Sequence, residues 1–354
     1  MRYGQPLSDL GYSAADRLLH RLALKYRPIA ELSFDIDQSM MRGDTAATAA
    51  GQHVFVAGLA RAGTTVLMRR FHATGQYRSL TYRDMPFVLA PRSWRRLSAR
   101  AQRPIASAER AHGDAVEVDG DSPESLDEVF WRVFAGEYLH RDRLTPHVPD
   151  DGVVDRYIRY VSSILASVPP AKTRYLCKNN NNILRLGAIR RAFPQALILV
   201  PFRQPLNHAH SLLRLHHRFS RIQAESPFAL SYMTWLGHHE FGLDHRPFRF
   251  DGAGPSPYDP NSLDYWLGLW CETYEALERS KPESALFVCY EDLCELPETW
   301  TRLARRADLA GGADSGAPFV SHNQPVGARY DAALADRAAA IYHRLLPQAR
   351  AALA

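Results

Sequence analysis

The chain has 354 residues, of which 46% are hydrophobic, and can bury the core of one large domain or two modest ones. Its formal net charge is +5, which suits an acidic ligand but is too small to indicate nucleic acid. The four cysteines show no paired spacing, so a cysteine metal site is not expected.

The N-terminus has no basic segment followed by a continuous apolar stretch, so no secretory signal is expected. The longest apolar runs, such as "ALILVPF", are far shorter than the roughly 20 residues that cross a bilayer. We therefore expect a soluble cytoplasmic protein, with peripheral membrane contact left open.

The first half of the chain predicts one strand and one helix after an N-terminal helical region. That region occupies residues 1–50, with helix over about 12–41, and is followed by a strand at 53–58 and a helix at about 64–74. Residues 91–120 carry six arginines and then turn acidic. This pattern indicates an exposed excursion and predicts a lid or substrate loop.

The second half alternates strands with helices. Ser125 and Glu128 have the spacing of a capping box at the start of a helix. The predicted order is then a helix at 153–168, a strand at 173–178, a helix at 182–193, a strand at 196–202, a helix at 206–219, a strand and turn at 284–293, and a last helix at 331–351. This alternation predicts an α/β fold of three layers, α/β/α, with a central parallel sheet and helical insertions. No linker divides the chain, so one domain over 1–354 is expected.

The stretch "HVFVAGLARAGTTVLMRRF" has the strand, loop and helix layout of a phosphate-binding loop. Gly58 and Gly63 keep the G-x-x-x-x-G spacing, but Thr64 stands where such loops carry lysine. Arg61 lies inside the loop, where its guanidinium, the amides at the helix start and the hydroxyls of Thr64 and Thr65 can bind an anion. The alternative is that the glycines serve the turn alone.

A nucleoside triphosphatase also needs an acidic residue after a second apolar strand, to hold magnesium. Here "ALILVPFRQP" ends in Arg203, which cannot bind a cation but can bind a second phosphate. The pair of motifs predicts a site for an anion-rich nucleotide without an obligatory metal.

These motifs resemble those of sulfotransferases that use 3′-phosphoadenylyl sulfate. "GLARAGTT" resembles their 5′-phosphosulfate loop, and "VPFRQPLNHAHSLL" is similar to their 3′-phosphate motif, in which Arg203 and Ser211 match the arginine and serine. The stretch that begins "KNNNNILRL" resembles the bacterial and Golgi-type pattern, with Lys178 and Asn182 at the matching positions. The resemblance covers roughly residues 53–90 and 172–294.

The resemblance implies a bacterial member with the P-loop-like sulfotransferase fold, 3′-phosphoadenylyl sulfate as donor, adenosine 3′,5′-bisphosphate as product and no required metal. The donor-binding residues that it implies are Ala60, Arg61, Ala62, Gly63, Thr64, Thr65, Arg203 and Ser211. Two departures stand out: Gln204 replaces a frequent aspartate, and the C-terminal glycine-and-basic motif is absent unless "PVGARYD" plays a similar part.

Sulfuryl transfer needs cations near the leaving group and a base near the acceptor. We assign the first role to Arg61 with the loop amides and to Lys178, whose alternative is a solvated lysine at a strand end. Asp84 in "SLTYRDMPF" is the first candidate base, with an exposed N-cap or a salt bridge to Arg83 as its alternative.

The second candidate base is His112, because histidine titrates near neutrality. Its neighbours Asp114 and Glu117, together with Asn182, are candidate substrate-binding residues, and Glu128 lies behind them on the next helix.

The other histidines, as in "LGHHEFGLDH", lack metal-site spacing and are expected to line or border an acceptor cleft. The predicted function is sulfuryl transfer to a hydroxyl or amine, with a glycan or glycolipid as the preferred acceptor. The alternatives are a P-loop kinase or nucleotide hydrolase, and a noncatalytic binder of polyanions that uses the basic segment 92–110.

Overall fold

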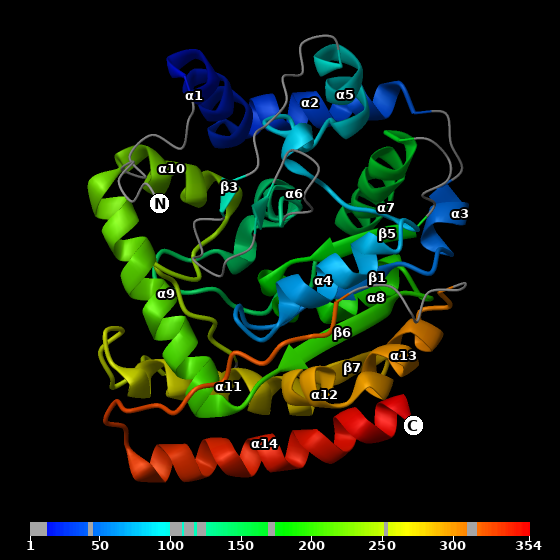
Figure 1. Cartoon of the computed structure of the whole chain (residues 1–354). Coiled ribbons are helices and arrows are strands. Elements are labelled where there is room, and N and C mark those ends of the chain that lie inside the picture. The colour runs from blue at the N-terminus through cyan, green and yellow to red at the C-terminus, as the bar shows by residue number, and fades with distance from the viewer. Residues whose placement is uncertain are drawn as a thin grey trace.

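The computed structural model describes residues 13–41, 45–99, 108–109, 117–118, 125–168, 174–250, 254–309 and 317–354, with the backbone alone at 108–109 and 117–118. In these residues, five parallel strands form a central sheet between layers of helices (Figure 1). No helix in the described ranges is long and apolar enough to cross a membrane.

The sheet has the order β2-β5-β1-β6-β7. Its strands are β1 (Val54–Val56), β2 (Tyr77–Arg78), β5 (Arg174–Lys178), β6 (Leu197–Phe202) and β7 (Ala285–Cys289). Every neighbouring pair is parallel, and Val56 lies opposite both Lys178 of β5 and Leu199 of β6. Parallel strands end at the same edge, so the segments that follow β1, β5, β6 and β7 meet there.

Alternate residues of the strands point into two separate cores. One core packs Val54, Leu176, Leu199 and Val288 under α4 (Thr64–Ala73), α12 (Tyr290–Glu295) and α13 (Pro297–Arg306). The opposite core packs side chains such as Phe55 and Ile198 under α7 (Asp151–Ala166), α8 (Leu186–Ala192), α11 (Leu263–Ser280) and α14 (Ala332–Leu353). The predicted α/β fold with three layers is confirmed.

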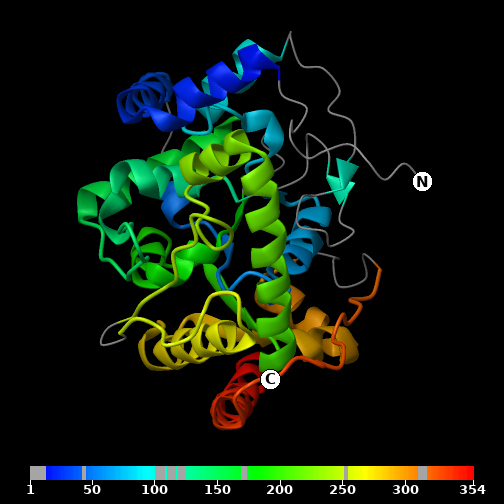
Figure 2. The same ribbon diagram turned by 90° about the vertical axis from the view of Figure 1, so that its left-hand side faces the viewer.

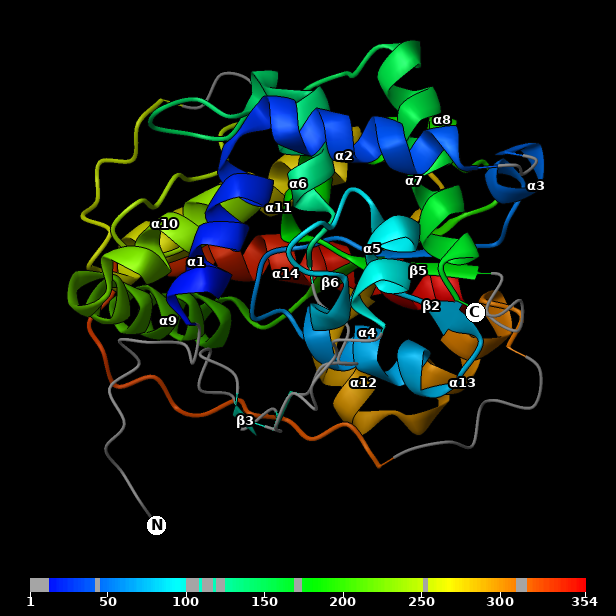
Figure 3. The ribbon, with the colours of Figure 1, turned by 90° about the horizontal axis from the view of Figure 1, so that it is seen from above.

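A further group of helices lies at the end of the molecule remote from α14 (Figure 2). It contains α1 (Ala14–His20), the π-helix η2 (Arg21–Lys25), α2 (Arg27–Ser39), α5 (Pro91–Ser98), α6 (Glu128–Phe134) and α10 (Pro227–Leu236). Seen from above, α2 lies over α6 and α7 (Figure 3). The buried carboxylate of Asp37 fixes α2 by accepting hydrogen bonds from Ser163 Oγ and from the backbone (2.7 Å) and hydroxyl (2.5 Å) of Ser93.

The remaining elements connect these layers. They are α3 (Thr45–Ala49), α9 (Pro205–Glu225), the 3₁₀ helices η3 (Tyr82–Asp84), η4 (Gly136–Tyr138) and η5 (Asn180–Leu184), and the antiparallel pair β3 (Ala108–Glu109) and β4 (Glu117–Val118).

Three details differ from the sequence-based expectations. The start of the expected lid, Pro91–Ser98, is a helix, because Ser93 anchors it to Asp37. The expected helix at 182–193 is divided between η5 and α8. The capping box of Ser125 and Glu128 does not form, because Glu128 turns inward to an ion pair and the Ser125 hydroxyl donates to Lys178 O (2.6 Å).

The ion pair joins Glu128 of α6 to Arg185, and both side chains are fully buried. Two guanidinium nitrogens donate to the two carboxylate oxygens, each at 3.0 Å, while Asn179 Nδ2 donates to Oε2 at 2.7 Å. Tyr138 also donates to this carboxylate. Although burial opposes ionisation, Arg185 and these donors hold the pKa of Glu128 below its ordinary value. The pair thereby fastens α6 to the chain that follows β5.

We expect Glu128→Ala to lower the free energy of unfolding by about 3–5 kcal/mol, because the Arg185 cation would stay buried without its partner. Denaturant titration followed by circular dichroism measures the loss. Replacement of both residues, Glu128→Met with Arg185→Leu, should cost less than the single change. As a control, Arg143→Ala removes an exposed ion pair with Asp142 and should change stability by less than about 1 kcal/mol. Equal losses for Glu128→Ala and Arg143→Ala would contradict the assigned role.

Candidate active site

The loop between β1 and α4 needs both of its spaced glycines. A Cβ on Gly58 would lie 3.1 Å from the carbonyl oxygen of Pro201, and one on Gly63 would lie 2.7 Å from the ring of Tyr290. Gly63 also has a φ of 89°, a conformation that glycine adopts without a steric penalty. The loop is therefore pressed against β6 and against the residue that follows β7.

Arg61 is one of two described non-glycine residues with positive φ, at 69°. Its Nε donates to Ser211 Oγ of α9 at 3.1 Å, which joins two motifs separated by 150 positions in the sequence. The loop then enters α4 at Thr64, which is buried, and Thr65, which is partly exposed. The first amides of a helix have no intrahelical acceptor and carry the positive end of its dipole, so this turn is suited to an anion.

Arg203 follows β6 and reaches the same loop. Its Nη1 lies 3.4 Å from Arg61 O, its Nε donates to Asn323 Oδ1 at 2.6 Å, and its guanidinium lies 4.8 Å from the centre of the Tyr290 ring. Burial lowers the pKa of Arg203, and the Arg61 cation lowers it further, against the opposing effects of Tyr290 and Glu291. Two like charges thus converge where a bound anion would relieve their repulsion.

His208 of α9 holds the loop through a hydrogen bond to its backbone. Its Nε2 lies 2.7 Å from Ala60 O, while its Nδ1 accepts a hydrogen bond from Trp270 Nε1 at 3.1 Å. Nε2 therefore carries the proton and donates to the carbonyl. Burial lowers the pKa of His208 to about 3, so the ring is neutral and positions the loop.

Lys178, the last residue of β5, lies at the same edge. Its register opposite Val56 places it beside the start of the loop, and the following amide, of Asn179, donates to Val56 O at 3.1 Å. Lys178 is 7% exposed, so it is not the solvated strand-end lysine of the alternative interpretation. Asn182 is fully buried beneath this turn, where its Nδ2 lies 3.4 Å from Cys177 Sγ.

Asp84 lies in a buried ion-pair cluster. Arg78 Nη2 donates to its carboxylate at 2.7 Å, Arg95 Nη1 lies 3.4 Å away, and the amide of Thr81 donates at 2.8 Å. The side chain is fully buried and forms a capping box with Thr81, so it is a buried cap paired with Arg78 and Arg95, in contrast to the exposed cap of the alternative interpretation. This environment favours a structural role over proton transfer.

The other predicted acceptor-side residues have no described side chain. His112 and Asp114 lie outside the described residues, and Glu117 is described only as backbone in β4. Their roles remain predictions.

Glu240, which the sequence analysis did not select, is a carboxylate beside the loop. Asn180 Nδ2, just after Lys178, donates to its Oε1 at 3.0 Å. In the described part of the chain, its second oxygen has no hydrogen-bond or ion-pair partner. Glu240 also lines a narrow pocket bounded by Leu59 and Ala60 of the loop. Its place in "GHHEFG", among histidines already noted, was the available sequence signal.

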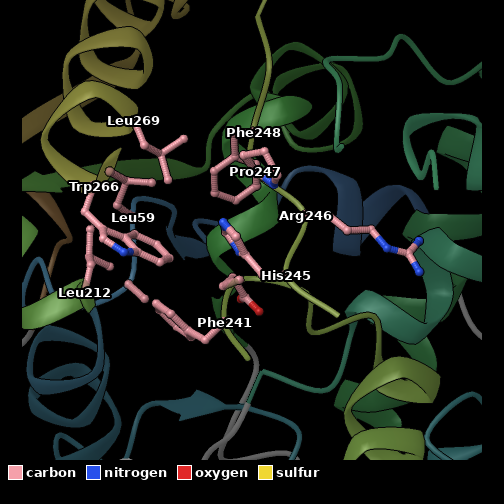
Figure 4. A pocket seen from close by; sticks show the side chains of 11 residues that line it. Leu59, Leu212, Phe241, His245, Arg246, Pro247, Phe248, Trp266 and Leu269 are labelled. Atoms are coloured by element: carbon pink, nitrogen blue, oxygen red, sulfur yellow. The ribbon is translucent and has the colours of Figure 1, made fainter. Parts of the chain in front are cut away.

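This pocket is apolar on most sides (Figure 4). Leu59, Leu212, Phe241, Trp266 and Leu269 line it together with His245. The ring nitrogens of His245 are engaged by the Tyr265 hydroxyl at 2.8 Å and by His239 O at 3.2 Å, and burial lowers its pKa to about 3. His245 thus lines this pocket. Among the described side chains, no group of three or more His, Cys, Asp or Glu could hold a metal ion.

Glu291, two positions after the end of β7, connects the arginine motif to the C-terminal segment. Its Oε1 accepts from the amide of Gln204 at 3.0 Å and from Asn323 Nδ2 at 2.8 Å, while Tyr342 of α14 donates to Oε2 at 3.1 Å. The chain before α14 crosses the front of the molecule near α4 and β6 (Figure 1). This segment passes beside Arg203, to which Asn323 is hydrogen-bonded. The sequence did not predict this contact.

Comparison with known proteins adds three findings. Residues 53–246 match the sequence model of the sulfotransferase family. Among solved structures, the chain is similar to sulfotransferase STF1 from Mycobacterium tuberculosis H37Rv, with 16% identity, a TM-score of 0.46, and coverage of 85% of this chain and 79% of that one. It is also similar to sulfotransferase STF9 from Mycobacterium avium, with 15% identity, a TM-score of 0.40, and coverage of 93% and 75%. No curated protein gives a significant match.

The family match contains the loop, Lys178, the Arg203 and Ser211 motif and Glu240, and it spans more than half of the chain. The protein belongs to the sulfotransferase family, as its motifs predicted.

Proposed function

We propose that this sulfotransferase moves the sulfuryl group of 3′-phosphoadenylyl sulfate to a hydroxyl or amine of its acceptor. The contact between the two anion motifs supports this donor most strongly: Arg61 Nε bonds Ser211, while Arg203 approaches the Arg61 carbonyl. A nucleotide with phosphates at both its 3′ and 5′ positions matches two adjacent cationic sites.

In this proposal, the loop from Ala60 to Thr65 holds the 5′-phosphosulfate, and Arg203 with Ser211 holds the 3′-phosphate. The acidic residue at the arginine motif, Glu291, has its carboxylate engaged by Gln204, Asn323 and Tyr342. A kinase or nucleotide hydrolase needs an acidic residue here to bind magnesium. The carboxylate of Glu291 already accepts hydrogen bonds from these three groups, which argues against that alternative.

Transfer forms a bond between the acceptor oxygen or nitrogen and sulfur, and breaks the bond between sulfur and the bridging oxygen of the donor. Adenosine 3′,5′-bisphosphate leaves with the electron pair. Arg61, the amides at the start of α4, and Lys178 stabilise the charge that grows on this leaving group. Burial of Lys178 strengthens that effect, because fewer water molecules screen its ammonium.

The proton of the acceptor goes to Glu240 in our proposal. Its second oxygen has no partner among the described residues, and its bond from Asn180 joins it to the turn that follows Lys178. Asp84 is a weaker choice because two arginines occupy its carboxylate. His112 stays a rival base from the expected lid, with Asp114 and Glu117 as neighbouring acceptor contacts.

The acceptor class that we propose is a glycan or glycolipid, as the bacterial and Golgi-type resemblance implied. Asn182 was expected to bind the acceptor; because it is fully buried and contacts Cys177 and Asn179, we propose that it supports the turn after β5 instead.

Arg61→Ala and Arg203→Ala should each weaken the binding of adenosine 3′,5′-bisphosphate by about 10- to 100-fold, because each removes hydrogen bonds to a charged ligand. Calorimetric titration without magnesium measures this, with ATP and magnesium as the comparison ligand and Arg143→Ala as the control protein. If the protein binds ATP in the presence of magnesium but does not bind the bisphosphate, the proposed donor is wrong.

Glu240→Gln should lower kcat by about 10²- to 10⁴-fold, because the amide cannot accept the proton, while bisphosphate affinity changes little. The measurement is steady-state kinetics with an acceptor found by screening. His112→Asn is the matched comparison and should retain activity. Loss of kcat in His112→Asn with normal turnover in Glu240→Gln would transfer the role to His112.

Glu291→Ala should raise the KM for the donor by about tenfold with kcat nearly unchanged, because Asn323 and the Gln204 amide lose the acceptor that holds them around Arg203. Glu291→Gln keeps one carbonyl oxygen for these donors and should recover most of the affinity. An equal loss in both variants, or a loss confined to kcat, would argue against this positioning role.

A further inference from the structure

Exposed large hydrophobic side chains are concentrated in the N-terminal helices. Six of the thirteen that are exposed in the described ranges fall within residues 18–40, and we call these six the N-terminal apolar patch. They are Leu18 (56% exposed), Leu22 (37%), Tyr26 (39%), Leu32 (59%), Ile36 (49%) and Met40 (39%). Exposed apolar side chains scattered singly are normal, but a cluster indicates an interaction surface.

Helix α2 shows why the patch faces outward. Ala30, Phe34 and Asp37 are buried and face the helices beneath. Leu32 and Ile36 each stand two positions from Phe34, which is about 200° around a helix of 3.6 residues per turn. They therefore occupy the opposite side, so α2 carries a second apolar stripe that the fold does not use. The helices of the patch lie toward the viewer in Figure 3.

Basic residues surround the patch. Helices α1, η2, α2 and the adjoining α5 carry seven of them: Arg17, Arg21, Lys25, Arg27, Arg92, Arg95 and Arg96. Arg27 is paired with Glu31 and Arg95 with the buried Asp84, so these two contribute less to the charge of this surface. The acidic residues of these helices that are not buried number three, Asp16, Glu31 and Asp35. Arg21, Lys25 and Arg27 are exposed, and each is adjacent in the chain to Leu22 or Tyr26. The charge of this region is thus complementary to an anionic surface.

We propose that the N-terminal apolar patch docks on an anionic lipid surface. Helices that lie on membranes combine aliphatic side chains, which enter the boundary of the acyl chains, with lysine and arginine that contact acidic headgroups. The composition of the patch fits this use better than a protein partner. It contains five aliphatic side chains and one tyrosine, whereas protein interfaces depend on a few aromatic anchors seated in pockets.

Docking of this kind does not depend on the proposed donor, and it brings the enzyme to a surface where a glycolipid acceptor would lie. The mode is peripheral: no helix in the described part of the chain meets the length and hydropathy needed for spanning.

Vesicle sedimentation of the full chain tests the proposal. The probes are vesicles of phosphatidylcholine with about one third phosphatidylglycerol, and vesicles of phosphatidylcholine alone. We expect the apparent affinity to be at least about tenfold higher for the anionic vesicles and to fall as salt is added. The variant Leu32→Glu with Ile36→Glu should lose about tenfold or more in affinity, because it places charges in the apolar stripe.

The matched control is Val148→Glu with Leu243→Glu, which adds the same charge at exposed apolar positions outside the patch and should bind like the wild type. Circular dichroism melting of every variant separates loss of docking from loss of folding. Equal sedimentation with neutral and anionic vesicles, or equal losses in the two double variants, would overturn the proposal. So would light scattering that shows a dimer, disrupted by Leu32→Glu with Ile36→Glu, in a protein that binds no vesicles.

Discussion

The parallel alignment of β5, β1, β6 and β7 is the constraint on which the site depends. Because all four strands end at one edge, the loop at 57–63, the lysine turn, Arg203 and Glu291 meet although more than 230 residues separate the first from the last. Their contacts are short and specific, as between Arg61 and Ser211. The sheet brings these segments together, and their side chains provide the cationic groups of the site.

Buried polar groups then hold each segment in place at that edge. Neutral His208 carries the loop through Ala60 O, and the Glu128 and Arg185 pair fixes the turn after β5 through Asn179. Such groups are costly to bury alone, so each is satisfied by several partners. The cost has a functional counterpart: cations that are already fixed need little reorganisation when a leaving group acquires charge.

The proposed donor side and the proposed acceptor side differ in how they are built. The donor side uses backbone amides, two arginines and the C-terminal segment, with Glu291 linking that segment to α14. Among the described residues, the proposed acceptor side has one carboxylate, Glu240, next to a mostly apolar pocket. The basic, apolar surface of α1 and α2 extends this contrast, because it fits a lipid surface on which a glycolipid acceptor would be presented.

The sequence by itself determined the α/β fold class, four of the five strands of the sheet and the two anion motifs, because hydrophobic periodicity and glycine spacing are local properties of the chain. It did not predict the short strand β2 or the order of the strands in the sheet. It could not place Asp84, which reads as an accessible acid but is buried between Arg78 and Arg95. Nor could it show that Ser125 and Glu128 abandon a capping box for Lys178 O and Arg185. Glu240, Asn323 and Glu291 join the site through contacts over 32 to 120 positions. Such pairings are decided only when the chain packs, since local sequence carries no record of which distant side chain will satisfy a buried charge.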